Sequence, residues 1–179
     1  MTHSNRLRGT FATDAGMLCV WRRTAFKMIR DHESWEQELL EDRDILRYIR
    51  KGDFVPIYIR SDGAFEVEVR LEPEPSLSER ELRYVVVSSK PYLFCSSGDL
   101  CLSGLEHVSG RPSKGTGRMN IRPGNYAVMI HLIAWDKERG SRDKKGKPRL
   151  TALPDFVVLM RPEPKKKMKY RTKVDTFDQ

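Results

Sequence analysis

The stretch that decides the fold is RMNIRPGNYAVMIHLIAW, residues 118–135, in which a Pro-Gly-Asn turn signal leads into the longest apolar run of the chain. Successive side chains of a strand point to opposite faces. One face would carry Tyr126, Val128, Ile130, Leu132 and Ala134, and the other Ala127, Met129, His131, Ile133 and Trp135. Because both sets are apolar, the run predicts a buried strand in the middle of a packed sheet, with a buried helix as the alternative.

Further β-rich runs lie on both sides of this stretch. They cover Met17–Trp21 and residues 82–88, 91–95, 100–102 and 156–160. The spacings between them are typical of hairpins, no strand–helix alternation follows Gly52, and the chain has no internal repeat. These features predict a mainly β (α+β) fold, an antiparallel β-sandwich or strongly bent sheet with one or two short N-terminal helices packed on it. They argue against a parallel doubly wound sheet.

The N-terminal helices are indicated by apolar residues at helical spacing: Trp35, Leu39, Leu46 and Ile49. Ser34 and Gln37 have the spacing of a capping box at the start, and Gly52 is placed to end the helix. The acidic run at residues 41–44 is expected to divide it into two short helices, with Asp42 capping the second.

Two β-rich runs within residues 55–71 flank Ser61-Asp62-Gly63, which predicts a hairpin. A two-residue Asp-Gly turn would place carboxylates opposite isoleucines. A three-residue loop with Gly63 in a left-handed conformation would instead pair apolar residues, Ile59 with Phe65, Ile57 with Val67 and Val55 with Val69. We therefore expect the three-residue loop with a bulge.

The 179 residues, of which 39% are hydrophobic, suit one domain with a real core. We expect a single globular domain over residues 1–162, with the stiff EPEPS connector at 72–76 inside it, and a basic, flexible tail at 163–179. The formal charge is +8, of which residues 136–149 contribute +4 and residues 161–179 another +4. The remainder of the chain is therefore neutral, so the basicity belongs to one loop and one tail.

The cysteines and the hydropathy indicate the compartment. Cys19, Cys95 and Cys101 are odd in number and lie in apolar runs, which favours reduced thiols, with a Cys95–Cys101 bridge as the alternative. No apolar segment has the length of a membrane span, and residues 2–10 lack the apolar stretch of a secretory signal. We expect a cytoplasmic protein that does not enter membranes.

Residues 110–118 have the glycine spacing of a phosphate-binding loop, since Gly110 and Gly115 match its two glycines. Thr116-Gly117 then stands where Lys-Ser/Thr should be, and Asn120 replaces the third glycine of GxGxxG. The motif therefore fails, and we expect no bound nucleotide. The serines near glycines also fail to form a Gly-x-Ser-x-Gly nucleophile elbow: Ser96, Ser97 and Ser103.

The four histidines form no HExxH motif and no paired spacing with cysteine: His3, His32, His107 and His131. His131 lies on an apolar face and is expected to be a hydrogen-bonded core histidine. Glu106 and His107 resemble a base and its orienting carboxylate, but adjacent residues of a strand would point to opposite faces. We therefore expect no catalytic residue, no metal ligand, no cofactor and no enzyme activity, and keep an uncharacterised hydrolase-like enzyme as a third hypothesis.

The basic residues are the candidate binding residues, chiefly through charge, with Tyr170 available to stack on a nucleic-acid base. They are Lys114, Arg118, Arg122, Arg142, Lys144, Lys145, Lys147, Lys165, Lys166, Lys167, Lys169, Tyr170 and Arg171. The neutral remainder shows no second basic surface that would complete a groove. An accessory nucleic-acid-binding role through residues 136–149 and 161–179 is thus an alternative, and a solvated tail that aids solubility is the simpler interpretation.

Residues 84–135 resemble small bacterial β-sandwich proteins of the competence-associated nuclease-inhibitor family and comparable immunity-type proteins. The resemblance rests on the order of three features: VVVSS, the Ser-Gly-x-Leu-x-Leu-Ser-Gly-x-Glu segment at 97–106, and Pro-Gly-Asn-Tyr leading into a strand. It implies binding and inhibition of a protein partner through an acidic face, for which Glu66, Glu68, Glu72 and Glu74 are available. Our leading hypothesis is therefore a non-enzymatic protein-binding module, an inhibitor or immunity protein, of unknown oligomeric state.

Overall fold

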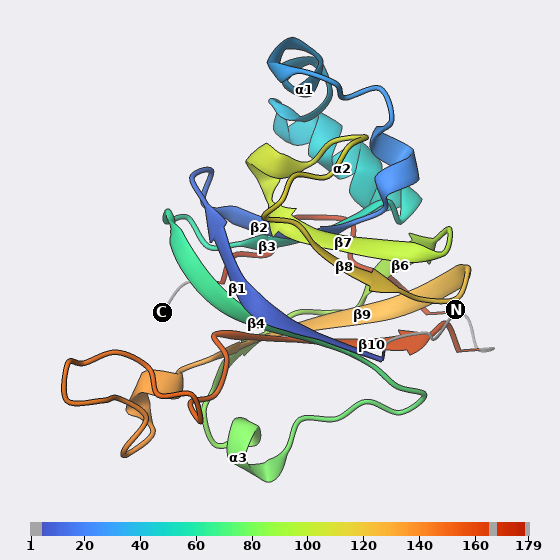
Figure 1. Ribbon diagram of the computed structural model, residues 1–179. Helices are drawn as coiled ribbons and strands as arrows, with labels where there is room; N and C mark the ends of the chain where they lie inside the picture. Colours follow the sequence, from blue (N-terminus) through green and yellow to red (C-terminus); the bar gives the residue numbers. More distant parts are fainter. Residues whose placement is uncertain (1–4, 165–167, 178–179) are drawn as a thin grey trace.

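The computed structural model describes residues 5–164 and 168–177, and shows two β-sheets packed face to face with helices outside them (Figure 1). The six-stranded sheet contains β1 (Arg6–Thr13), β4 (Gly63–Leu71), β10 (Phe156–Pro162), β9 (Gly124–Ile133), β5 (Val85–Ser88) and β6 (Tyr92–Ser96). The four-stranded sheet contains β3 (Phe54–Tyr58), β2 (Met17–Trp21), β7 (Asp99–Gly104) and β8 (Gly117–Asn120). This is the β-sandwich that the sequence predicts.

The helices lie outside this sandwich. The short 3-10 helix η1 (Arg23–Phe26), α1 (His32–Leu39) and α2 (Asp42–Lys51) cover the four-stranded sheet, whereas α3 (Glu79–Leu82) lies beyond the six-stranded one (Figure 1). Two further 3-10 helices follow strands, η2 (Leu105–His107) after β7 and η3 (Trp135–Lys137) after β9. Because helices cover one face of the four-stranded sheet and the other sheet covers its second face, every residue of β2 is buried.

The buried strand predicted within residues 118–135 is confirmed as β9 (Gly124–Ile133), an interior strand. It pairs with β10 on one side and with β5 and β6 on the other. Tyr126, Val128 and Ile130 belong to the core between the sheets, and among the apolar side chains of the opposite face Met129 is exposed, at 37%. Residues 117–120 form the separate strand β8 in the other sheet, so the stretch at 118–135 crosses from one sheet to the other.

The hairpin predicted over residues 55–71 is wrong. β3 pairs with β2 in one sheet, and β4 pairs with β1 and β10 in the other, so Phe65 lies opposite Phe11 and Val67 opposite Gly9. Between the two strands it is Arg60, with φ of 68°, that adopts the left-handed conformation. Both runs do carry apolar faces, but the faces are buried in different sheets. The pairing of β10 with β4 is also parallel, in a sandwich whose other pairs are antiparallel.

Two short helices are confirmed, although their caps differ from those predicted. The capping box consists of Asp31 and Ser34 rather than Ser34 and Gln37, because the chain is already helical from His32. Asp42 is the first helical residue of α2 and makes no side-chain cap. Gly52 ends α2 as predicted, in a left-handed conformation with φ of 73°.

Two segments elsewhere also differ from expectation. The predicted strand at 82–88 begins only at Val85, because Ser78 and Glu81 form a capping box that starts α3. Residues 168–177 are expected to be part of a flexible tail, but they pack against the sandwich. The backbone of Arg171 forms an isolated β-bridge with Tyr92 of β6, and Phe177 is 1% exposed in the core. Burial of this aromatic ring attaches the segment to the sandwich, while Lys169 and Lys173 remain exposed.

The three cysteines are free thiols, with Cys19 and Cys101 buried and Cys95 half-buried, so no bridge joins Cys95 to Cys101. Within the described ranges, no helix combines the length and apolar character that crossing a membrane requires.

A candidate binding cleft beside helix α1

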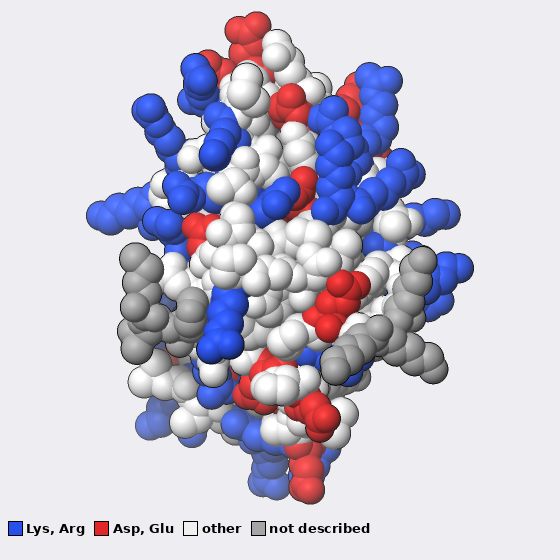
Figure 2. Space-filling model, turned by 90° about the vertical axis from the view of Figure 1, so that its right-hand side faces the viewer, with Lys and Arg blue, Asp and Glu red and all other residues white. Residues whose placement is uncertain are grey.

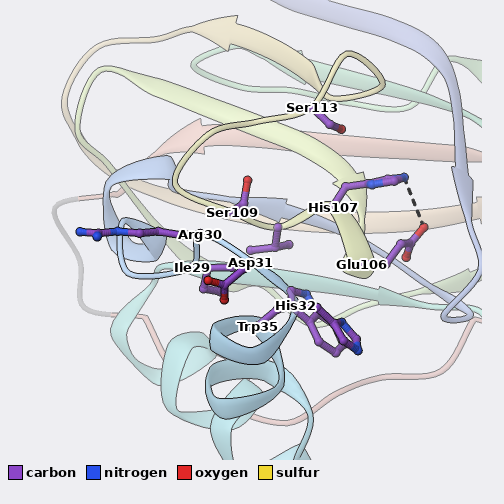
Figure 3. Close-up of a pocket in the computed structure, with 10 residues that line it drawn as sticks. Ile29, Arg30, Asp31, His32, Trp35, Glu106, His107, Ser109 and Ser113 are labelled. Atoms are coloured by element: carbon purple, nitrogen blue, oxygen red, sulfur yellow. Dashed lines mark ion pairs between the residues drawn. The ribbon is translucent and has the colours of Figure 1, made fainter.

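A cleft with a volume of about 420 Å³ opens between the N-terminal end of α1 and the loop that joins β7 to β8 (Figure 3). It is lined by Ile29, Arg30, Asp31, His32, Trp35, Glu106, His107, Val108, Ser109 and Ser113. We call it the α1 cleft. It combines three aromatic rings and two aliphatic side chains with cationic, acidic and hydroxyl groups, the composition typical of a binding pocket.

The wall on the α1 side is organised by the helix cap. Asp31 accepts a hydrogen bond from the Ser34 amide at 2.9 Å, and the Ser34 hydroxyl donates to the same carboxylate at 2.6 Å. These bonds from Ser34 hold the pKa of Asp31 below its usual value, so its carboxylate remains ionised. The exposed His32 ring stacks on Trp35, with ring centroids 6.3 Å apart and planes at 12°. The cap therefore places an anion beside an aromatic pair.

Two bonds attach the opposite wall to this one. The Trp35 indole Nε1 donates to the carbonyl of Leu105 at 3.0 Å, and the Gly110 amide donates to the carbonyl of Ile29 at 3.1 Å. A Cβ at Gly110 would lie 2.9 Å from the Lys27 Cα, so only glycine permits this approach. Segments about 80 residues apart in the sequence thus form the two walls of one cleft.

Glu106 connects the floor of the cleft to the β1–β2 turn. Its carboxylate accepts hydrogen bonds at 3.1 Å from the Thr13 hydroxyl and from the Asp14 amide. His107 Nε2 lies 3.7 Å from Glu106 Oε1 (Figure 3), so the expectation that these residues point apart was wrong. The reason is that they lie in the 3-10 helix η2 and not in a strand.

The serine hydroxyls at the cleft bond within their own loop. Ser109 donates its hydroxyl proton to the Arg111 carbonyl at 2.7 Å, and no hydrogen bond between described residues joins a serine to His32 or His107. Nor do His, Cys, Asp and Glu side chains gather in threes anywhere in the described part of the chain, as a metal site would require. What remains is an aromatic hollow with charged groups around it.

A second hollow of about 390 Å³ adjoins the cleft and is lined by Lys27, Ile29, Arg30, Gly110 and Arg111. Ile29 and Arg30 line both hollows, so the two are neighbours. We call the second one the cationic end, because its three charged lining residues are all basic.

The sequence-predicted binding residues do not form one surface. Lys114 is exposed next to Ser113 at the cleft, Arg118 on β8 lies 3.3 Å from Asp99, and the Arg122 carbonyl accepts a bond from the Tyr126 hydroxyl. Figure 2 shows one face of the molecule, where Lys and Arg predominate over the upper half, with an uncharged area at its centre.

The basic loop at 136–149 lies on the far side of the six-stranded sheet from the cleft (Figure 1). Arg142 is placed 5.0 Å above the Trp135 ring and donates to the Gly146 carbonyl. Lys144, Lys145 and Lys147 are exposed.

In the tail, Tyr170 donates its hydroxyl to Glu163 at 2.9 Å and Arg171 pairs with Asp175, whereas Lys169 is exposed. Lys165, Lys166 and Lys167 lie outside the described residues. The Tyr170 hydroxyl is therefore occupied by an acidic partner within the chain.

Other groups singled out in the sequence have structural roles. His131 is 6% exposed, and its Nδ1 lies 2.8 Å from the Ser88 hydroxyl, which confirms a hydrogen-bonded core histidine. Burial lowers its pKa. Two of the carboxylates expected to form an acidic face already form ion pairs within the protein. Glu68 is buried and pairs with Arg6 and Arg70, and Glu66 pairs with Arg8.

Sequence reasoning missed the α1 wall of the cleft. The helical spacing assigns Trp35 to an apolar stripe, and no motif in the sequence points to His32, Arg30 or Asp31. The signal present in the sequence is the capping pair Asp31 and Ser34 directly before Trp35. The opposite wall was not predictable locally, because it depends on the Gly110–Ile29 contact.

The same arrangement of sheets and helices occurs in two solved structures. The inhibitor of the DNA degrading activity of NucA from Bacillus subtilis, ComJ, superposes with a TM-score of 0.51 at 7% identity, covering 91% of this chain and 100% of ComJ. The fold is similar to that of ComJ. Crocagin biosynthetic gene J superposes with a TM-score of 0.57 at 15% identity, covering 92% of this chain and 100% of the other.

At these identities the likeness to ComJ concerns the fold, and at that level the resemblance to nuclease inhibitors seen in the sequence is confirmed. No protein-family model and no curated protein sequence matches the chain.

Proposed function

We propose that this chain is a non-enzymatic, cytoplasmic protein-binding module of the inhibitor type, and that the α1 cleft receives a projecting segment of its partner. The observation that carries the proposal is the cleft itself: an open hollow of about 420 Å³ that brings the His32–Trp35 stack, Asp31 and His107 together. Aromatic groups in partly desolvated pockets supply most of the energy in many protein interfaces. The fold shared with ComJ, which inhibits NucA, supports a binding role over catalysis.

The test uses variants that remove exposed rings without disturbing the core. His32 and His107 have side chains that are 81% and 44% exposed, so His32→Ala/His107→Ala should fold normally. The control is Lys144→Ala/Lys145→Ala in the basic loop, on the far side of the molecule. Each purified protein is used for quantitative affinity capture from native lysate of the source cells, and the captured protein is then reconstituted and titrated by calorimetry.

We expect the wild type and the loop control to recover one protein stoichiometrically and the cleft variant to lose it. If the cleft variant recovered as much of the protein as the wild type, the cleft would not be the binding site. If the wild type repeatedly recovered no protein, the proposed binding function would be wrong.

A further inference from the structure

We propose that the cationic end of the α1 cleft selects an acidic segment of a protein partner, an inference that rests on the function proposed above. Lys27, Arg30 and Arg111 line this hollow. Within the described residues, none of their side chains has a carboxylate within ion-pairing distance. None of the three is therefore held in an ion pair by the described residues, and the carboxylate that acts on them is Asp31, through its electrostatic interaction with Arg30.

Other arginines at the four-stranded sheet do form ion pairs within the protein. Arg23 and Arg118 share one carboxylate oxygen of Asp99, at 3.4 and 3.3 Å, and Arg22 pairs with the buried Asp53. Those charges stabilise the protein's own loops. The contrast points to the cationic end as a place where an external anion would gain from pairing, because it meets cations that are not already held in an ion pair.

The backbone keeps these cations together. Gly110 contacts the chain at Lys27 so closely that a Cβ there would lie 2.9 Å from the Lys27 Cα, and its amide is bonded to Ile29. Arg111 follows directly, so Lys27 and Arg111 come from two segments in direct contact. Like charges held near one another repel, and an anionic ligand relieves that repulsion.

The acidic side chains in the aromatic part of the cleft favour an acidic peptide over a nucleic acid as the anionic partner. Asp31 and Glu106 line the aromatic part, and Asp31 is held ionised by its bonds from Ser34. A nucleic-acid strand carries a negative charge at every phosphate and would be repelled there. A peptide can place its carboxylates against the cations and still offer backbone N–H donors to Asp31 and Glu106. The charge pattern therefore fits an acidic peptide with an aromatic or aliphatic anchor.

The experiment compares two variants that each lose three positive charges. Lys27→Gln/Arg30→Gln/Arg111→Gln alters the cationic end, and Lys144→Gln/Lys145→Gln/Lys147→Gln alters the basic loop. Fluorescence anisotropy measures the Kd of each protein for three labelled probes. These are a short peptide with Asp and Glu around one Tyr, its Asn/Gln counterpart, and a single-stranded oligonucleotide of the same net charge as the acidic peptide.

We expect the wild type to prefer the acidic peptide to both other probes, with a Kd that the cleft variant weakens by about tenfold or more and the loop variant by about twofold or less. Equal weakening by both variants, tighter binding of the oligonucleotide, or no binding of the acidic peptide would overturn the inference. The capture experiment with the histidine variants is independent of these probes. A partner recovered there, together with failure here, would leave the binding function standing and remove only the acidic specificity.

Discussion

The backbone amide of Gly110 donates a hydrogen bond to the carbonyl of Ile29 at 3.1 Å, so the loop after β7 is attached directly to the segment that precedes α1. A methyl group at position 110 would lie 2.9 Å from the Lys27 Cα, a backbone atom that cannot move independently. Gly110→Ala should therefore lower the free energy of unfolding by about 1–3 kcal/mol, as overpacking does.

Gly115→Ala, in the same loop but with open space around the new methyl group, is the matched control and should leave stability nearly unchanged. Urea denaturation followed by circular dichroism measures both. If the two variants proved equally stable, the contact between the loop and the α1 segment would not be as close as described.

Gly52 closes α2 in a left-handed conformation and also faces a crowded site. A Cβ there would lie 2.6 Å from the Cys95 sulfur. Gly146 has a similar φ, 77° against 73°, but open space around it. Both Ala substitutions should cost about 1 kcal/mol for the backbone conformation, and Gly52→Ala should cost about 1–3 kcal/mol more. Thermal denaturation measures the difference, and adding Cys95→Ala to Gly52→Ala should restore part of it. Identical melting temperatures for the two single variants would argue against the clash.

Glu81 forms a buried ion pair with Arg70. Burial alone would raise its pKa, but the hydrogen bonds from Arg70 and Ser78 outweigh it and lower the pKa to about 2. A folded-state pKa below the unfolded value means that the stabilisation is complete above about pH 4.5 and is lost as the pH falls towards 2.

Glu81→Gln should therefore cost on the order of 3 kcal/mol at pH 7 and flatten the loss of stability in acid. Glu79→Gln, on the exposed surface of the same helix, is the control. Denaturant titrations between pH 2 and 7 report both effects. If the free energy of unfolding of Glu81→Gln fell with decreasing pH as steeply as that of the wild type, the Glu81–Arg70 pair would not control the loss of stability in acid.

From the buried His131 we expect the stability of the protein to depend on pH in a second range, at higher pH than for Glu81. Burial lowers its pKa, so the unfolded chain binds the proton more tightly than the folded one. Stability is then full above the unfolded pKa of about 6.5 and decreases as the pH falls below it. His131→Leu should remove this decrease. It should cost about 1 kcal/mol at pH 7, because the lost bond between Nδ1 and the Ser88 hydroxyl is partly offset by removing Nε2, which is buried without a hydrogen-bond partner among the described residues.

The control for this prediction is His107→Gln, which replaces an exposed imidazole and should leave the decrease in place. Melting temperatures recorded from pH 5 to 8 make the comparison. The assignment fails if the histidine 131 variant loses stability with acidification as the wild type does.

Features of the fold that depend on the sequence of a single segment were predicted correctly. The apolar alternation at β9, the glycine that ends α2 and the sandwich class all follow from local side-chain periodicity and backbone preference. The hairpin failed because Ile57 and Val67 are each buried against another strand, and local register cannot show which of several apolar faces will pair. For the same reason the cleft escaped prediction: its walls meet only through contacts between residues 27–35 and residues 105–113.

The position of β10 has a consequence for how the chain reaches this structure. β10 lies between β4 and β9 in the six-stranded sheet, and Phe177 packs on Phe156 with ring centroids 6.0 Å apart. The centre of that sheet is thus built from a strand that is synthesised after the five others of the sheet. A nascent chain ending before residue 156 would leave the adjoining edges of β4 and β9 open, with their hydrogen-bonding groups unpaired. The core should therefore close only after β10 has been synthesised, and fragments truncated within β10 should aggregate rather than fold.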